Sequence, residues 1–466
     1  MNKRSDSNFI QGFLLSYLFL LLSSTVSVCI LYDKTRPEYY NNLWLLPMIF
    51  GGFVWAFTLI FRKTWSNLST VAVIGIFSIR NVITPFIMFL GDYKGYFRFL
   101  SVENVNKGIL LMLVESLILI VYTSFKINKV NHTPSLSSLD LNTNTTETAL
   151  FFISLLIFVG VWVIRPDFFS GFKNVFSSTD IRVAEVEDSA KGILYTLFSF
   201  LFPLAYLNIC LFLIKKINFG IISSKLIKTL LNLMVISIPL FFMNNSDGFT
   251  LICVTSLALI VYRIGGINKA TFYIVIGGTL MTVFLYILLM VASMSFGAKN
   301  LTTLNQLSRA FQAYFPGVCN FAGFFNMRDY NKLDTLFYDV YSTIPFRNTI
   351  FGVQSDRRLV VLYTAQNAAP SHIIPCICQL FAYLSVLAPF VECLFIKGCI
   401  KSYEKTKRET SIYKLFNFYM LFIYFALTPI MYNGTIFLTR CMQTIFPMML
   451  LAAFFSRNQK QKTIEA

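Results

Sequence analysis

The fold is decided by an apolar stretch that recurs along the chain. Its first occurrence, at residues 9–32, reads FIQGFLLSYLFLLLSSTVSVCILY, which is long enough to cross a bilayer as a single helix. About a dozen such stretches of roughly 18 to 24 residues follow one another. One long segment without this character, residues 297–371, interrupts them late in the sequence. The pattern predicts a polytopic membrane protein with one large loop.

The composition agrees with this pattern. Hydrophobic residues make up 56% of the chain and charged residues only 13%, which is far from the average of soluble globular domains. Lipid offers the backbone no hydrogen-bond partners and the runs are too long for barrel strands, so helices are predicted. We therefore expect an all-α protein with about 12 transmembrane helices. The predicted spans are residues 9–32, 43–61, 68–90, 107–125, 148–166, 192–214, 226–243, 248–262, 271–296, 372–396, 414–432 and 435–455.

Basic residues set the predicted orientation. Lys and Arg concentrate in cytoplasmic loops, and a cytoplasmic N-terminus puts the densest basic cluster, Lys397 to Lys414, on that side. Both termini are then cytoplasmic. The chain is divided into residues 1–296 with most of the spans, an external loop at 297–371, and residues 372–466 with the last spans and a cytoplasmic tail. The shorter external loops are predicted at 33–42, 91–106, 167–191 and 244–248.

Charge and motifs argue against several classes of function. The net charge of +17 reflects this topology and contact with anionic lipid, and no basic module for nucleic acid is visible. The sequence has no phosphate-cradling Gly-Lys-Ser/Thr loop, no dinucleotide fingerprint and no His-Glu zinc helix. Cys376 and Cys378 are too close together for metal spacing or an unstrained disulfide. We therefore expect no metal, no cofactor and no nucleic-acid partner.

Two arginines lie inside predicted spans: Arg80, in SIRNVITPF, and Arg440, in the last span. A mid-membrane arginine costs about 2.5 to 3.5 kcal/mol, so each should face a partner or a cavity. Glu115 is the obvious partner of Arg80. The pair is either a buried tie between helices or part of a cationic lining for an anionic ligand. Glu392, near the predicted cytoplasmic end of its span, is expected to snorkel to the surface.

Further arginines lie in predicted external segments. Arg165 lies at the outer end of the predicted fifth span, Arg182 lies in the connection after it, and Arg357 and Arg358 lie in the long loop. The planar guanidinium suits bidentate binding of phosphate oxygens, so these residues predict an external phosphate site. The alternative is a solvated surface on which acidic residues pair with them.

Two residues are candidate proton acceptors. His372 is the only histidine predicted to be external, and an imidazole suits proton abstraction near neutral pH. A capping or packing role at the mouth of a helix is the alternative. Asp247, in the external turn before the eighth span, is the other candidate base.

Aromatic residues crowd the segment SRAFQAYFPGVCNFAGFF at 308–325, on both sides of a Pro316-Gly317 break. We expect an amphipathic element that lies on the outer leaflet, with its aromatic rings at headgroup level. Stacking of the rings on sugars is the alternative.

The segment AFQAYFPGVCNFAGFFNM at 310–327, followed by SHIIPCICQLFAYLSVLAPFVECLF at 371–395 and a basic loop, resembles the Wzy-type polymerases of bacterial capsule and O-antigen repeat units. The resemblance extends to the helix count, the late external loop and the external stretch from Arg182 to Gly192.

The resemblance implies a glycosyltransferase at the outer face of the bacterial cytoplasmic (inner) membrane. Its donor and acceptor would be polyprenyl-diphosphate oligosaccharide, and its partners membrane lipid and the flippase and chain-length regulator of the same pathway. On this hypothesis His372 or Asp247 is the base. The diphosphate-binding residues would be Arg80, Arg165, Arg182, Arg357, Arg358 and Arg440.

Two other functions remain open. A flippase for lipid-linked oligosaccharide would also have about a dozen spans and a cationic cavity, but related halves and no long external loop are expected of it. A ligase that moves finished glycan to its final acceptor would share the late loop and the membrane-embedded arginine. A passive structural or receptor role would leave the embedded arginines unexplained.

Overall fold

The computed structural model describes residues 3–61, 67–93, 100–128, 145–164, 189–219, 224–242, 249–264, 303–328, 331–344, 357–367, 373–450 and 453. All regular secondary structure in these ranges is helical, which confirms the all-α class. Among the described residues, six helical segments are long and apolar enough to cross a membrane, so a multi-pass membrane protein is supported, while the count of about 12 stays a prediction. The six are Gly12–Tyr32, Glu38–Ile60, Leu68–Leu90, Val102–Ile127, Cys376–Arg408 and Ile412–Met431.

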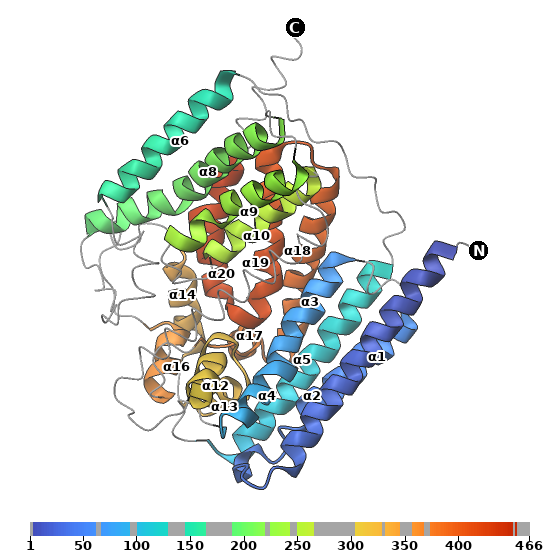
Figure 1. Ribbon diagram of the computed structural model, residues 1–466. Helices are drawn as coiled ribbons and strands as arrows, with labels where there is room; N and C mark the ends of the chain where they lie inside the picture. The colour runs from blue at the N-terminus through green and yellow to red at the C-terminus, as the bar shows by residue number, and fades with distance from the viewer. Residues whose placement is uncertain are drawn as a thin grey trace.

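The N-terminal helices lie side by side in one bundle (Figure 1). They are α1 (Lys3–Tyr32), α2 (Leu45–Ile60), α3 (Leu68–Ser78), α4 (Thr84–Leu90) and α5 (Val102–Asn128). The Asn67 side chain accepts a hydrogen bond from the Ser69 backbone N–H and so caps the start of α3. A short π-helix, Ile79–Ile83, joins α3 to α4. Such π-helical turns often occur at functional sites.

The C-terminal helices pack against this bundle. They are α17 (Cys376–Leu384), α18 (Ala388–Arg408), α19 (Ile412–Met431) and α20 (Gly434–Arg440), which continues into a π-helix at Cys441–Ile445. Helix α18 packs on α3, α5 and α19. Ser385, with a φ of 51°, separates α17 from α18. Because α18 continues to Arg408, the predicted end of this span at residue 396 falls inside a helix.

The middle of the chain forms a second group of helices (Figure 1). It comprises α6 (Thr145–Ile164), α8 (Ser189–Phe219), α9 (Lys225–Phe242) and α10 (Phe249–Ile264). Residues of α8, α10 and α19 share one hydrophobic core, which is separate from the core of the N-terminal bundle. The predicted span at 271–296 lies outside the described residues.

Loops that the topology assigns to one side of the membrane meet in the structure. The Tyr93 hydroxyl, after α4, donates a 2.9 Å hydrogen bond to Asp33, after α1. Tyr40 contacts the sulfur of Cys319, from the long inter-span segment, at 2.6 Å. Burial, together with the hydrogen bond to Asp33, raises the pKa of Tyr93. The three segments therefore share one end of the bundle.

Two segments predicted to be cytoplasmic also meet. Arg263, at the end of α10, donates hydrogen bonds to the backbone carbonyls of Thr406 and Glu409, at the end of α18. A guanidinium is well placed there because the last carbonyls of a helix lack intrahelical partners. Each of these contacts joins segments that the predicted topology places on the same side of the membrane. Which of the two sides faces the cytoplasm stays a prediction.

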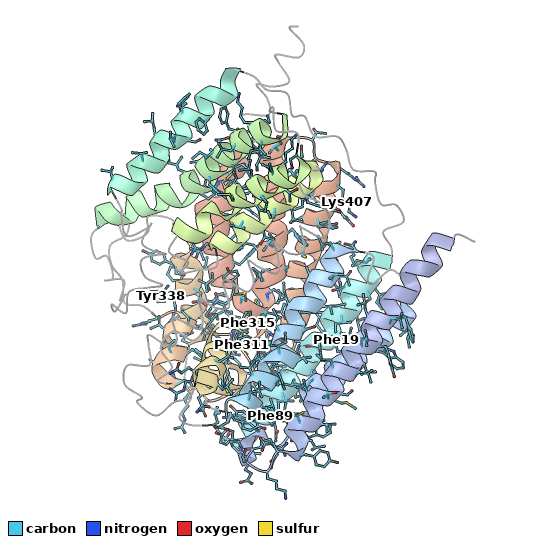
Figure 2. All side chains as sticks on the ribbon, in the orientation of Figure 1. Phe19, Phe89, Phe311, Phe315, Tyr338 and Lys407 are labelled. Atoms are coloured by element: carbon cyan, nitrogen blue, oxygen red, sulfur yellow. The ribbon has the colours of Figure 1, made fainter. Side chains whose placement is uncertain are left out.

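The described part of the long inter-span segment is helical. It contains α12 (Thr303–Tyr314), α13 (Val318–Phe325), α14 (Lys332–Ser342) and α16 (Leu359–Asn367). The predicted Pro316-Gly317 break is confirmed, because it separates α12 from α13. Helix α12 packs on α4, and α13 packs on α5 and α16. Phe315, just after α12, packs against the core of the bundle, and its ring centroid lies 5.4 Å from that of buried Phe311 in α12 (Figure 2).

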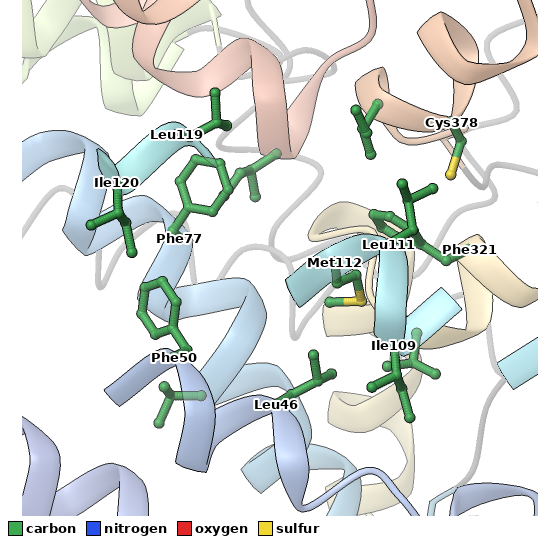
Figure 3. Close-up of a cluster of buried hydrophobic side chains, with 14 of the residues drawn as sticks. Leu46, Phe50, Phe77, Ile109, Leu111, Met112, Leu119, Ile120, Phe321 and Cys378 are labelled. Carbon is green, nitrogen blue, oxygen red and sulfur yellow. The ribbon is translucent and has the colours of Figure 1, made fainter. Parts of the chain in front are cut away.

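Helix α13 is buried in the protein, so the prediction that it lies on the outer leaflet was wrong. Phe321 is completely buried and belongs to the same hydrophobic core as Leu111 of α5 and Cys378 of α17 (Figure 3). Gly108 makes this approach possible, because a Cβ there would lie 2.9 Å from the Cβ of Phe321. The aromatic rings therefore face neighbouring helices rather than lipid headgroups.

Polar contacts also fix α13 in place. Burial raises the pKa of the Cys319 thiol to about 12, so the thiol stays protonated and donates to the side-chain oxygen of Gln312 at 2.6 Å. The Tyr363 hydroxyl of α16 donates to the backbone carbonyl of Asn320 at 3.1 Å. Asn367, one turn further along α16, donates to the carbonyl of Gly323 at 3.0 Å.

Candidate functional site

The first polar cluster lies inside the bundle and centres on Arg80. Its guanidinium forms a fully buried ion pair with Glu115 of α5, which confirms the predicted pairing. It also lies 3.4 Å from the backbone carbonyl of Pro429 in α19. The rings of Phe77 and Phe321 flank it, with centroids at 5.0 and 5.3 Å. Arg80 thereby ties three helices and α13 together.

Of the two roles considered for Arg80 and Glu115, this geometry matches a buried ion pair that holds neighbouring helices together. A diphosphate would have to displace Glu115 to reach the Arg80 guanidinium, and separating a buried pair leaves an uncompensated charge in the interior. Diphosphate binding by Arg80 stays a prediction, and it would require a rearrangement of this pair.

Glu392 belongs to the same cluster, so the prediction that it snorkels to the surface was wrong. Its side chain is completely buried and interacts electrostatically with Glu115 and Arg80. The prediction failed because α18 runs on to Arg408, which places Glu392 well inside the helical span. The cluster therefore combines two acidic groups with one basic group.

The second polar cluster surrounds Asp339 of α14, whose side chain is only 4% exposed. Its Oδ2 atom accepts hydrogen bonds from the Gln379 amide at 2.6 Å and from the Tyr383 hydroxyl at 2.7 Å, both on α17. Its Oδ1 atom accepts a 3.2 Å hydrogen bond from the backbone N–H of Leu359, the first residue of α16. One carboxylate thus joins three helices.

Gln379 connects this carboxylate to α20. Its amide nitrogen also donates to the Thr435 hydroxyl at 2.6 Å, and its oxygen accepts from the backbone N–H of Gly434 at 2.8 Å. Asn433 caps α20 by accepting a hydrogen bond from Ile436. We call Asp339, Leu359, Gln379, Tyr383, Gly434 and Thr435 the Asp339 cluster.

Three of the predicted phosphate-binding arginines are close in the chain to this cluster. Arg357 and Arg358 immediately precede Leu359, and Arg440 is the last residue of α20. Arg357 is exposed, and its guanidinium lies 3.8 Å from the carboxylate of Asp334, one turn before Asp339. The other predicted site residues, Arg165, Arg182, Asp247 and His372, lie outside the described residues.

The Asp339 carboxylate is a hydrogen-bond acceptor held in place by its neighbours. Every hydrogen bond found to its carboxylate in the described ranges comes from a neutral donor, namely an amide, a phenol or a backbone N–H. Such donors hold the carboxylate in place but do not neutralise its charge. The carboxylate can therefore accept a further hydrogen bond from a hydroxyl. The alternative is a structural role, in which Asp339 joins α14 and α17 and caps α16.

Sequence reasoning missed Asp339, although a signal was present. In the sequence KLDTLFYDVYS of α14, polar and apolar residues alternate with the period of a helix. Thr335, Asp339 and Ser342 therefore fall on one face, opposite the apolar residues. That face is buried in the structure. Within the described ranges, no group of three or more His, Cys, Asp and Glu residues could hold a metal ion.

No protein-family model, curated protein or solved structure matches this chain. The resemblance to Wzy-type polymerases therefore rests on the sequence segments at 310–327 and 371–395 and on the pattern of spans.

Proposed function

We propose that this protein is a membrane glycosyltransferase that polymerises polyprenyl-diphosphate-linked oligosaccharide repeat units into O-antigen or capsule. The observation that carries the proposal is the Asp339 cluster, a buried carboxylate that accepts a hydrogen bond from Leu359, the residue directly after two arginines in the chain. The proposed site of action is the outer face of the bacterial cytoplasmic membrane. The reaction requires a proton acceptor and fixed positive charge, which this arrangement combines.

In the proposed reaction a hydroxyl of the incoming repeat unit attacks the anomeric carbon of the growing glycan. The new glycosidic bond forms as the bond from that carbon to the lipid diphosphate breaks. The hydroxyl proton passes to a base, and the diphosphate leaves with the bonding electron pair. We assign the base role to Asp339, and His372 and Asp247 stay alternative candidates.

Positive charge is proposed to stabilise the departing diphosphate. Arg357 and Arg358, next to Leu359, and Arg440, on α20, are the described candidates nearest in the chain to the Asp339 cluster. Arg80, Arg165 and Arg182 complete the predicted set. A guanidinium binds two phosphate oxygens at once, which favours arginine over lysine for this role.

The function is tested by a gel of surface and lipid-linked glycans from a deletion strain. Surface glycan reduced to a single repeat unit, or lipid-linked single units accumulating outside, would support the polymerase. Long polymer that stays on its lipid would identify a ligase instead. Single units trapped on the cytoplasmic face would identify a flippase.

The role of Asp339 is tested by complementing that strain with Asp339→Asn. We expect polymer formation to fall by about 10² to 10⁴-fold, the usual contribution of a general base, at an unchanged protein level in the membrane. Asp334→Asn, an exposed carboxylate on the same helix, is the matched control and should retain polymer. Normal polymer in the Asp339→Asn strain would refute the assignment.

A further inference from the structure

Helix α14 carries an apolar stripe that the described residues leave uncovered. Leu333 is 78% exposed, Phe337 61% and Val340 51%. These positions follow the i, i+4, i+7 spacing of one helix face. We call this surface the α14 stripe, and its members are Leu333, Leu336, Phe337 and Val340.

The helix is inverted relative to an ordinary amphipathic helix on a soluble protein. Its polar residues Thr335, Asp339 and Ser342 face the protein and are buried, while its large apolar residues point outward. In water this arrangement would leave a contiguous apolar surface without cover, and such surfaces mark interaction sites. The inversion indicates that the surroundings of α14 are themselves apolar.

The neighbours of α14 identify those surroundings. Helix α14 packs on α17 and α20. Just after α17, within the candidate span Cys376–Arg408, Val386 is 76% exposed and Phe390 61%. Leu438 of α20 is 44% exposed. In a helix that crosses a bilayer, outward-facing residues of this kind contact lipid. Helix α14 therefore packs on segments that themselves expose large apolar side chains, one of them within a candidate span.

We propose that α14 is an interfacial helix whose stripe is immersed in the acyl-chain region of the membrane. The helix Lys332–Ser342 reaches only about 16 Å at 1.5 Å per residue, against about 30 Å for the hydrocarbon core, so it cannot span the bilayer. Lys332 and Asp334 at its start are exposed and polar, as expected at the headgroup level. The proposal stands independently of glycosyl transfer.

One consequence concerns the Asp339 cluster. Asp339 lies on the face of α14 opposite the stripe, and a helix with its side chains is about 10 Å across. The carboxylate would therefore lie about 10 Å from the lipid surface. A ligand anchored in the bilayer by a lipid chain could reach that depth with its headgroup.

The experiment places a nitroxide spin label at Phe337→Cys in protein reconstituted into phosphatidylethanolamine and phosphatidylglycerol vesicles. Collision with oxygen, which concentrates in lipid, is compared with collision with a water-soluble nickel chelate. We expect the ratio of oxygen to nickel accessibility to be several-fold higher at Phe337→Cys than at Asp334→Cys, the matched position on the polar flank. Leu333→Cys serves as a second stripe position, and unsubstituted protein gives the background from native cysteines.

Two results would overturn the proposal. Higher nickel than oxygen accessibility at both stripe positions would place the stripe in water. Low accessibility to both reagents would show that protein, such as a second copy of this chain, covers it. A high oxygen ratio at either stripe position, with the reverse at Asp334→Cys, supports immersion in lipid.

Discussion

Helices α13 and α14 come from the same inter-span segment, and their surroundings are opposite. Phe321 of α13 is completely buried, whereas Phe337 of α14 is 61% exposed. The difference lies in what each helix packs against. Helix α13 meets α5 at Gly108, where the missing side chain lets the backbone and the Cβ of Phe321 in α13 come close. Helix α14 meets Gln379 and the other polar groups of α17, which select its polar face.

Aromatic content therefore does not decide which short helix contacts the membrane. The aromatic segment at 308–325 was expected at the outer leaflet, and the structure uses it as core. The α14 stripe, shorter and less conspicuous in the sequence, is the surface left open. Figure 2 places Tyr338 of α14 at the margin of the molecule, away from the centre of the bundle.

The largest expected effect is a contrast between two phenylalanines. Phe321→Ala should lower the free energy of unfolding by about 3 to 5 kcal/mol, because it leaves a cavity in the core and removes a ring from Arg80. Phe337→Ala, an exposed position on α14, should change it by less than about 0.5 kcal/mol in detergent. The measurement is the heat-induced reaction of buried cysteines with a fluorescent thiol reagent. Equal losses in the two variants would show that α13 and α14 do not differ in how much their phenylalanines contribute to stability.

A smaller effect is expected where α13 rests on α5. Gly108→Ala places a Cβ 2.9 Å from that of Phe321 and 3.3 Å from the backbone nitrogen of Ala322, so we expect a loss of about 1 to 3 kcal/mol from overpacking. Gly75→Ala is the matched control, because nothing lies within 4 Å of a Cβ there. That control should be neutral or more stable by about 0.5 to 1 kcal/mol, since alanine favours a helix. A stabilised Gly108→Ala protein would show that α13 does not pack tightly on α5.

The smallest effect on stability is expected beside α14. The pair of Arg357 and Asp334 is exposed, with 3.8 Å between the charged atoms, and such pairs contribute about 0 to 1 kcal/mol. Arg357→Ala should therefore leave the unfolding temperature almost unchanged. If Arg357 binds diphosphate, polymer formation should still fall, and Arg357→Lys should restore only part of it because lysine lacks the planar fork. A large loss of stability would instead assign Arg357 a structural role.

Much of the fold could be predicted because it depends on local properties. The length of an apolar run decides whether it can cross a bilayer as a helix, and Pro316-Gly317 ends a helix through its own backbone. The partner of Arg80 was also predictable, since a charge inside a span requires a counter-charge and Glu115 lay in the next span. Because successive spans cross the membrane in alternating directions, the sequence also predicts which loops lie on the same side. The contacts made by Tyr93 and by Arg263 agree with that prediction.

The candidate site was harder to predict because its members are far apart in the chain. Asp339 becomes a candidate site residue only through its hydrogen bonds to Gln379 and Tyr383, some forty residues later in the chain. The sequence alone does not show that the polar face of α14 packs against the polar side chains of α17. Glu392 was misplaced because its depth depends on where α18 ends. His372, Asp247, Arg165 and Arg182 stay predictions.

The amino-acid sequence is sufficient to establish that the chain is helical, that it contains several apolar helices able to cross a membrane, and where charge inside those helices requires compensation. These properties depend on residues a few positions apart, through the helical period and the cost of unpaired polar groups in lipid. Only the tertiary structure decided that α13 is core, that α14 turns its apolar stripe outward, and that Asp339 meets α17 and α16. Those outcomes depend on the complementarity of distant surfaces, a small gap at Gly108 in one case and a polar side chain at Gln379 in the other.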